Sequence, residues 1–462
     1  MTDEPTTPAS GMRDFLPDQV ARRNYVFDII RDVYEGYGFE PLETPSMERL
    51  STLLGKYGED EKLIFRIMKR GEKLQRALDD DPSEDALADL ALRYDLTVPL
   101  ARIFAEHGHD FPRVFKRYQI GPVWRADRPQ KGRYREFYQC DVDILGSEST
   151  LVEAEVIAAA TDALERLGFE DFRIHANHRK LLDGMMEVAG IDDAMRSEAL
   201  VAIDKLDKIG LKGVVDELDS RGISDDAVDT LMPLLDQGAE TDTPPFDNQR
   251  ILDAIADQVG QTDSGGRAVS ELETLFDVCE HNSAGQHLYF DPYLARGLSY
   301  YTGSIFEIRS DDFPGSLAAG GRYDDLVGMF TNQDVPACGF SLGVERIIDL
   351  MEDREMFDID ETPADVMVAV WNEEFAADSM AIARQMREAG LRTDLYPGVD
   401  DGFGKQFGYA DERDVPFVAI FAPDEKEAGS VAIRDMESGD QIEVSREHAG
   451  EETARLILKA RD

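Results

Sequence analysis

Cysteine and long apolar runs are scarce in this chain, and their scarcity limits what the protein can be. Its three cysteines, Cys140, Cys279 and Cys338, are widely separated among 462 residues, which excludes a disulfide framework and a CxxC metal site. Nowhere do about 18 apolar residues follow one another, and the N-terminus has neither a basic start nor an apolar core. We therefore expect a cytoplasmic protein with reduced thiols that does not interact with membranes.

Zinc and P-loop signatures are also missing. The seven histidines show no HExxH pattern, and His107 and His109, on one short loop, are more typical of solvated side chains than of metal ligands. No GxxxxGK[ST] run is present, and residues 402–405 (GFGK) do not follow that pattern. The sequence therefore predicts no protein-held metal, zinc included.

Positive charge is scarce as well. The chain has 49 Lys and Arg against 95 Asp and Glu, a formal net charge of -46, and the acids are spread from end to end. With 42% hydrophobic residues it is expected to form two or three globular domains with a strongly anionic surface. Near 1 M salt the screening length is about 3 Å, which would remove most of the repulsion. This favours a halophilic, salt-adapted protein, with a moderately acidic protein of ordinary cytosol as the alternative.

Four regions differ in their patterns of apolar residues. Residues 1–180 and 281–357 mix helical spacing with strand-like alternation, residues 181–280 carry short helix patterns between polar breaks, and residues 363–462 alternate strand and helix patterns after a linker. The clearest segments are predicted helices over residues 19–37, 151–167, 200–209, 251–259 and 379–388, and predicted strands over residues 39–45, 114–124, 136–145, 286–290, 301–308, 366–370 and 417–421. These patterns predict an α/β protein with a two-part core, a helical insertion and a small C-terminal α/β domain.

Cations gather between the two strands predicted over residues 114–124 and 136–145. They are Arg125, Arg128, Lys131, Arg133 and Arg135. Such an island in so acidic a protein indicates an anionic ligand. Arginine suits phosphate because its planar fork donates two parallel hydrogen bonds. A surface hairpin whose arginines pair with nearby acids is the alternative.

Alternation along residues 136–145 separates two faces of that strand. One face is apolar and the other mainly polar: Tyr138, Cys140, Val142 and Ile144 against Phe137, Gln139, Asp141 and Asp143. We expect the apolar face in the core. The other combines an aromatic ring, an amide and two carboxylates, which suits a base, an amine and a polar side chain lying along the sheet.

The run over residues 132–141 (GRYREFYQCD) is similar to motif 2 of class II aminoacyl-tRNA synthetases, and resembles the archaeal and eukaryotic branch of the histidyl-tRNA synthetase family. The resemblance implies that Arg125 grips the α-phosphate of ATP and that Phe137 stacks on adenine. It further implies that the other loop cations contact phosphates or the tRNA acceptor end: Arg133 with ATP, and Arg128, Lys131 and Arg135 with tRNA.

Three further segments extend the resemblance to this family. Residues 339–346 (GFSLGVER) resemble motif 3, which implies that Arg346 covers the other face of adenine and reaches the terminal phosphate. Pro45 matches the motif 1 proline at the dimer interface of this class, which implies a homodimer. Residues 294–303 (LARGLSYYTG) and 318–324 (AAGGRYD) resemble the two histidine-specific signatures.

The first signature implies roles close to the reacting groups. Arg296 is expected to hold the α-phosphate near the histidine carboxylate, and Tyr300 and Tyr301 to belong to the histidine-binding set, with Tyr301 lining the imidazole pocket. Ser299 stands where the family usually has Asp. Any orienting role of that carboxylate is therefore open.

The same resemblance implies a polar pocket for histidine. Asp95, Thr97 and Gln139 are expected around the α-amino group and Asp143 on the imidazole, where a carboxylate and a phenol can read its donor and acceptor nitrogens. Bacterial relatives carry Glu where this chain has Asp95 and Asp143. Because the Asp side chain is shorter than that of Glu, both a direct contact and a contact through a bridging water remain open for each carboxylate.

The implied fold and reaction follow from the family. The fold is the class II antiparallel sheet flanked by helices, with a helical insertion and a C-terminal α/β anticodon-binding domain, and the reaction joins histidine to tRNA(His) at the expense of ATP with Mg²⁺ on its phosphates. Lys405, within residues 404–410, is expected at the tRNA, although an ordinary polar helix is the alternative.

Three other functions share parts of this pattern. A regulatory paralogue serving histidine biosynthesis would be expected to lack the insertion, the last domain and several binding positions. A synthetase-like module of a stress-sensing kinase would accompany a kinase segment, which this chain does not have. A proline or threonine synthetase would lack both histidine signatures.

Overall fold

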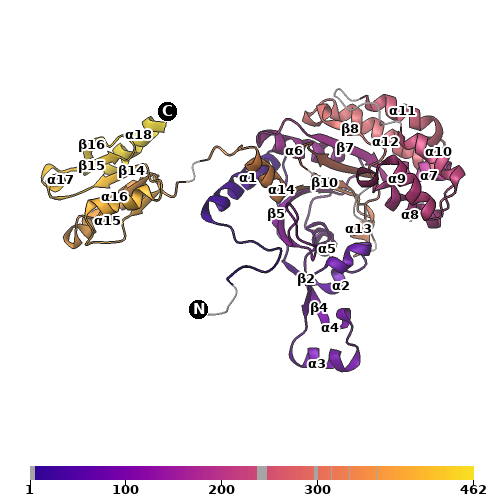
Figure 1. Ribbon diagram of the computed structural model, residues 1–462, viewed down its shortest axis with the longest axis horizontal. Helices are drawn as coiled ribbons and strands as arrows, with labels where there is room; N and C mark the ends of the chain where they lie inside the picture. Colours follow the sequence, from indigo (N-terminus) through magenta and orange to yellow (C-terminus); the bar gives the residue numbers. More distant parts are fainter. Residues whose placement is uncertain are drawn as a thin grey trace. The chain divides into compact units, whose positions relative to one another are not determined.

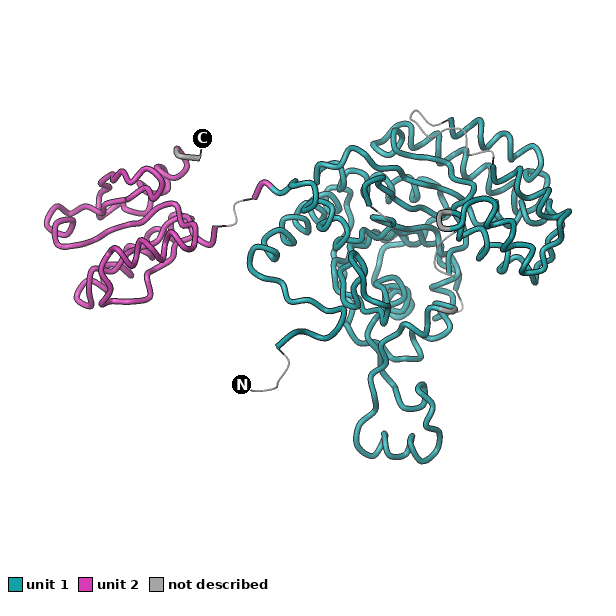
Figure 2. The backbone as a smooth tube through the Cα atoms, viewed as in Figure 1, with its two compact units in different colours: residues 1–357 teal, residues 358–462 magenta. Residues whose placement is uncertain are grey.

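The computed structural model describes residues 6–236, 247–295, 300–313, 315–331, 333–359 and 362–461. Two compact units divide the chain at residues 357 and 358, and each is described by itself (Figure 2). Arg296 and Ser299 lie outside the described residues. None of the helices described there is long and apolar enough to cross a membrane.

An eight-stranded sheet forms the centre of the first unit. Its order is β1 (Glu40–Pro41), β5 (Phe115–Trp124), β6 (Glu136–Leu145), β11 (Ala337–Gly343), β10 (Ser316–Arg322), β9 (Ser304–Arg309), β7 (Arg173–His178) and β8 (Leu288–Phe290). The six central strands pair antiparallel, and the two edge strands pair parallel. The antiparallel sheet expected from the resemblance is thereby confirmed.

Helices cover one face of this sheet and bury the apolar side of β6. Helices α1 (Pro17–Gly36), α6 (Leu151–Arg166) and α14 (Val344–Asp353) contribute to one core cluster with Cys140 and Ile144, whose exposure is 0%. Figure 1 shows α1, α6 and α14 beside the central sheet. The apolar face of β6 therefore lies in the core, as its alternation predicts.

A smaller sheet and several helices adjoin the central sheet. The small sheet has the order β2 (Met47–Arg49), β4 (Ala88–Leu92), β3 (Arg66–Met68), and nearby helices are α2 (Leu50–Leu53), α3 (Gly71–Asp80), α4 (Glu84–Leu87), α5 (Thr97–His107) and α13 (Asp325–Gly328). A helical group, drawn together in Figure 1, comprises α7 (Arg179–Val188), α8 (Asp193–Ile203), α9 (Leu206–Ser220), α10 (Asp225–Leu235), α11 (Asn248–Val259) and α12 (Asp263–Cys279). Short 3₁₀ segments span Gly58–Leu63 and Ser283–Gln286.

Two predicted segments differ most from the structure in their bounds. The helix expected over residues 200–209 straddles the break between α8 and α9, and α9 itself is interrupted at Gly210, whose φ of 69° is left-handed. The strand expected over residues 39–45 pairs with β5 as a strand only at Glu40–Pro41. Pro41 and Pro45 lack the N–H that a longer ladder requires.

The second unit is an α/β domain. Its five-stranded sheet has the order β13 (Thr393–Leu395), β12 (Val366–Val368), β14 (Phe417–Ile420), β15 (Ser430–Asp435), β16 (Gln441–Ser445). Its helices are α15 (Ala376–Glu388), α16 (Phe403–Asp411), α17 (Pro423–Ala428) and α18 (Ala449–Arg461), with a 3₁₀ turn at Glu373–Phe375. The C-terminal α/β domain expected from the sequence is confirmed.

Candidate active site

Strands β5, β6 and β11 place a row of polar side chains on one face of the sheet. Arg117 on β5 lies opposite Asp143 on β6, and Gln119 lies opposite Asp141. On the other side of β6, Ser341 of β11 is the partner of Asp141. Arg117, Asp141 and Asp143 are at most 2% exposed, so this face carries a buried polar cluster and not solvated surface.

Asp143 is held from three sides. Its Oδ2 forms an ion pair of 2.7 Å with Nη2 of Arg117, and the Tyr323 hydroxyl donates a short hydrogen bond to Oδ1. Gly339 on β11 leaves the space that the carboxylate occupies, because a Cβ there would lie 1.9 Å from Oδ1. Burial raises the pKa of Asp143, whereas Arg117 and then Tyr323 lower it.

Gln139 and Asp141 carry acceptor atoms without partners among the described residues. The Gln139 amide donates to the Ser341 hydroxyl over 2.8 Å, but its Oε1 accepts nothing, and neither does Oδ1 of Asp141. Burial raises the pKa of Asp141 to about 7, and Arg117 opposes this rise. Buried acceptors are nearly always satisfied in folded proteins, so these two indicate a donor supplied by a ligand or water.

Asp95 lies in a second cluster joined to the first by aromatic rings. Its Oδ1 accepts from the Tyr57 hydroxyl (2.9 Å) and the backbone N–H of Val98 (3.0 Å), and its Oδ2 accepts from the Tyr300 hydroxyl (3.2 Å). Burial raises the pKa of Asp95. The Tyr300 ring lies 5.9 Å from that of Tyr323, the residue that donates to Asp143.

Thr97 and Tyr301 border the same place. Thr97 is the first residue of α5, two positions after Asp95. The Tyr301 ring meets the Tyr300 ring edge to face at 5.2 Å. The predicted histidine-binding residues among those described therefore come together from β6, the start of α5 and the segment before β9.

Three arginines gather beside these polar clusters. Arg346 on α14 donates from Nε to the Gly132 carbonyl (3.2 Å) and from Nη1 to the Ser316 carbonyl (2.5 Å), so it bridges the loop before β6 to β10. Burial lowers the pKa of Arg346, and the positive charges of Arg133 and Arg125 lower it further. Like charges brought this close indicate a site for a polyanion.

Arg125 is anchored through one nitrogen of its guanidinium. Its Nε donates to the Tyr94 carbonyl over 3.2 Å, and its Cζ lies 4.2 Å from the Tyr94 ring centroid and 5.1 Å from that of Phe137. No described residue forms a hydrogen bond with its two Nη atoms. The fork that suits a phosphate is therefore available next to the ring predicted for adenine.

The other loop cations differ in their surroundings. Exposed Lys131 pairs with Asp353 (2.9 Å), Arg128 is exposed, and Arg133 approaches Asp127 at 3.4 Å. Half-buried Arg135 donates to the carbonyls of Asp127 and Ser10, so it fixes the N-terminal segment. In the second unit, exposed Lys405 pairs with Asp401 (2.6 Å). The alternative of a surface hairpin whose cations pair with nearby acids thus applies to Lys131 and Arg133 of this loop.

Four members of the two polar clusters have no predicted role from the sequence: Arg117, Tyr323, Ser341 and Tyr57. Tyr323 belongs to the segment resembling the second histidine signature, which was a usable signal. Arg117 has no local signal, because its role depends on which residue of β6 lies opposite it. Alternation along β6 predicts Asp141 on the polar face, where the structure has it, but the family resemblance does not place it in the histidine-binding set.

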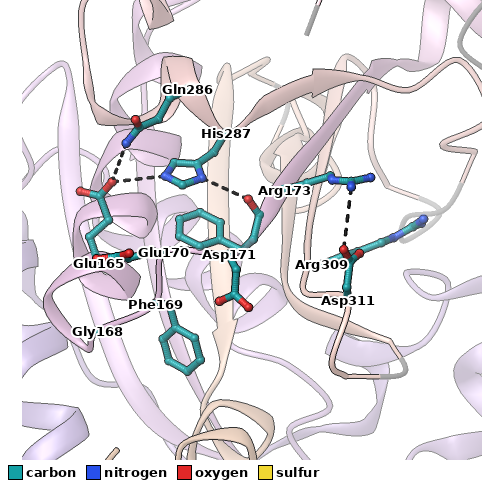
Figure 3. Close-up of a pocket in the computed structure, with 11 residues that line it drawn as sticks. Glu165, Gly168, Phe169, Glu170, Asp171, Arg173, Gln286, His287, Arg309 and Asp311 are labelled. Atoms are coloured by element: carbon teal, nitrogen blue, oxygen red, sulfur yellow. Dashed lines mark hydrogen bonds and ion pairs between the residues drawn. The ribbon is translucent and has the colours of Figure 1, made fainter. Parts of the chain in front are cut away.

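A separate cavity of about 700 Å³ lies at the β7–β8 end of the sheet. Figure 3 shows two groups of contacts among the side chains that line it: Glu165 contacts Gln286 and His287, and Arg173 contacts Asp311. None of the predicted site residues lines it. Across the described part of the chain, no group of three or more His, Cys, Asp or Glu is arranged to hold a metal ion.

Family models match both units. A model described as histidyl-tRNA synthetase matches residues 11–347, and one described as anticodon binding domain matches residues 365–455. A histidine–tRNA ligase of Porphyromonas gingivalis is 42% identical over 449 residues, 95% of this chain and 96% of that protein. One from Gloeobacter violaceus is 39% identical over 464 residues, 96% and 97% of the two chains. These relatives are bacterial and give no support to the archaeal and eukaryotic branch expected from motif 2.

Solved structures agree with the sequence relatives. Histidyl-tRNA synthetase from Nostoc superposes with a TM-score of 0.79 at 30% identity, covering 98% of this chain and 100% of the other. A Bacillus halodurans protein described as an ATP phosphoribosyltransferase regulatory subunit/histidyl-tRNA synthetase has a TM-score of 0.73 at 22% identity, covering 91% and 100%. At that identity the second likeness concerns the fold alone.

Proposed function

This chain belongs to the histidyl-tRNA synthetase family, and we propose that the polar face of β5, β6 and β11 is where it binds histidine beside ATP. The protein is a histidine–tRNA ligase, which activates histidine as histidyl-adenylate and transfers it to the 3′ end of tRNA(His). The observation that carries the proposed site is the pair of unpartnered buried acceptors on Gln139 and Asp141, which share one face of β6 with Phe137, the ring beside Arg125.

In the proposed pocket, the α-amino group of histidine lies at Asp95, Thr97 and Gln139, and the imidazole lies at Asp143. Tyr300 and Tyr301 enclose the ligand. An ammonium group donates three hydrogen bonds, and Oε1 of Gln139 is a buried acceptor of this set that no described residue pairs. A buried site of this kind rejects analogues that lack the hydrogen bonds by a factor of about 10⁴ or more.

For ATP, we assign the α-phosphate to Arg125 and Arg296, the adenine to Phe137 and Arg346, and further phosphate contacts to Arg133. The histidine carboxylate attacks the α-phosphorus in line and pyrophosphate leaves, so no side-chain nucleophile is needed. The protein contributes positioning and neutralisation of the developing charge. Mg²⁺ is proposed to arrive on the ATP phosphates, because the side chains assigned to ATP are arginines and a phenylalanine, which do not bind metal ions.

For tRNA, we assign Arg128, Lys131 and Arg135 to the acceptor end and Lys405 to the anticodon side. Residues 1–180 and 281–357 would form the catalytic core, residues 181–280 an insertion, and residues 363–462 the anticodon-binding domain. In so acidic a protein, local cations must supply the phosphate contacts, and at high salt the gain from counterion release is small. Base and shape contacts should then matter more.

We also propose a cytoplasmic homodimer adapted to a salt-rich interior. Support for the dimer is the motif 1 resemblance at Pro45, and support for salt adaptation is the net charge of -46.

The activity is tested by amino-acid-dependent pyrophosphate exchange at about 1 M KCl, where screening is nearly complete. Exchange is expected with histidine and with none of the other nineteen amino acids, followed by charging of tRNA(His). Exchange with proline or threonine but not histidine would refute the assignment. Absence of any exchange would favour a regulatory protein.

Salt adaptation is tested by stability. The free energy of unfolding is expected to rise between about 0.1 M and about 2 M KCl, because the screening length falls from about 10 Å to below 3 Å and repulsion among surface acids is removed. Urea titrations at each KCl concentration measure it. A stability that stays constant or falls would identify an ordinary acidic cytosolic protein.

A further inference from the structure

We propose that Arg117 is a positioning residue that makes the histidine pocket select the neutral imidazole over the imidazolium. The proposal rests on the assignment of the imidazole to Asp143 made above. Arg117 is fully buried, which is costly for a guanidinium unless it is paired, and its partner is Asp143 at 2.7 Å.

The pair also connects two parts of the pocket. Nη2 of Arg117, the atom nearest Asp143, donates to the Leu96 carbonyl over 3.2 Å. Leu96 lies between Asp95 and Thr97, the residues proposed for the α-amino group. Arg117 therefore fixes the spacing between the two ends of the histidine site. Its Nε and Nη1 have no hydrogen-bond partner among the described residues.

The charge state of the ligand follows from the charge that Arg117 supplies. A buried carboxylate without a counterion favours a cationic ligand, because an uncompensated charge in a low dielectric is unstable. With Arg117 opposite, Asp143 is already neutralised and can accept the N–H of a neutral ring. Histidine offers both forms near neutrality, because the pKa of imidazole is about 6.5.

The groups around Asp143 reinforce the need for this counterion. Those that interact with it or lie against it are Tyr34, Asp95, Asp141, Tyr301, Tyr323 and Cys338. Burial raises the pKa values of the phenols and the thiol, so they stay neutral. The remaining two are carboxyl groups, so loss of Arg117 would leave up to three acids facing the ring.

The test is the pH profile of kcat/KM for histidine in pyrophosphate exchange. In the wild-type enzyme it is expected to rise up to about pH 6.5 and then remain level, following the neutral ring. In Arg117→Met the complex must hold one more proton, on the ring or on Asp143, so kcat/KM should fall about tenfold per pH unit once the pH exceeds the pKa values of both the free imidazole, about 6.5, and Asp143. The change should lie in KM more than in kcat.

Two comparisons separate positioning from a structural role. Arg117→Lys keeps the charge and should restore the level wild-type profile. A histidine analogue with a 1,2,4-triazole ring, far less basic than imidazole, should lose more kcat/KM than histidine does in Arg117→Met. Equal losses for both substrates at every pH would show that Arg117 only stabilises the fold and would overturn the proposal.

Two further variants complete the design. Arg354→Met removes a guanidinium paired with Asp171 and Asp312 outside the pocket, and should keep the wild-type pH profile.

Asp143→Asn should raise the KM for histidine at every pH. An unchanged KM would show that the imidazole does not bind at Asp143 and would overturn the proposal. The ligase activity is tested separately, by the exchange reaction of the wild-type enzyme. A wild-type profile that declined above about pH 6.5 would also overturn the proposal.

Discussion

Replacing Arg125 by methionine is expected to slow histidine-dependent pyrophosphate exchange by about 10³-fold, at the upper end of the range for losing one donor to transition-state charge. The α-phosphorus gains negative charge at its oxygens as the carboxylate attacks, and Arg125 is proposed to face that charge with both Nη atoms. Its Nε is fixed on the Tyr94 carbonyl and its plane lies near the rings of Tyr94 and Phe137, so little reorganisation is needed. Single-turnover adenylate formation measures the step directly.

The controls distinguish charge from geometry. Arg125→Lys keeps the charge but loses the two-pronged fork, so it should recover part of the rate and less than half of the lost activation free energy. Arg31→Met, which removes an exposed guanidinium paired with Asp28 on α1, should leave exchange unchanged. A rate within threefold of wild type in Arg125→Met would exclude Arg125 from the α-phosphate.

The parts of the fold that could be predicted are those with a local signal. Strand β6 matches its predicted bounds because polar and apolar residues alternate over residues 138–144, and α6 matches within one residue because its apolar spacing is regular. The break between α8 and α9 could not be predicted. Leucine and isoleucine continue at helical spacing across Asp204 and Lys205, and no proline marks the interruption.

The residues of the site likewise divide into those that a local sequence signal could predict and those that it could not. Gln139 and Asp143 could be assigned to one face because alternation in a strand is a property of the chain itself. Arg117 could not, because a strand's sequence does not specify which residue of its neighbour lies opposite. The sequence therefore predicts that the carboxylate of Asp143 meets a ligand. It does not predict that a buried guanidinium already neutralises this carboxylate.

Glu345→Ala is expected to lower the free energy of unfolding of the first unit by about 3 kcal/mol, the lower end of the range for removing one partner of a buried ion pair. Glu345 is 5% exposed at the start of α14. Its Oε2 accepts from Arg13 (2.5 Å) and Arg23 (2.6 Å), and its Oε1 accepts from the backbone N–H of Tyr138 (3.2 Å). Urea unfolding at constant KCl, followed by circular dichroism, measures the change.

Three segments of the chain contact this one carboxylate. Its removal should therefore lower the free energy of unfolding more than the removal of a surface ion pair does. The N-terminal segment, helix α1 and strand β6 would each lose an anchor, and Arg23 would keep a buried, unbalanced charge beside the rings of Phe15 and Tyr138. Glu352→Ala, two turns further along α14 and paired with Arg22 at 3.3 Å, should cost less than about 1 kcal/mol because both side chains are partly exposed. Equal effects of the two substitutions would mean that Glu345 contributes no more than a surface ion pair. A larger effect of Glu345→Ala, accompanied by slower pyrophosphate exchange, is expected because Tyr138 lies between Phe137 and Gln139, the residues proposed for adenine and the α-amino group.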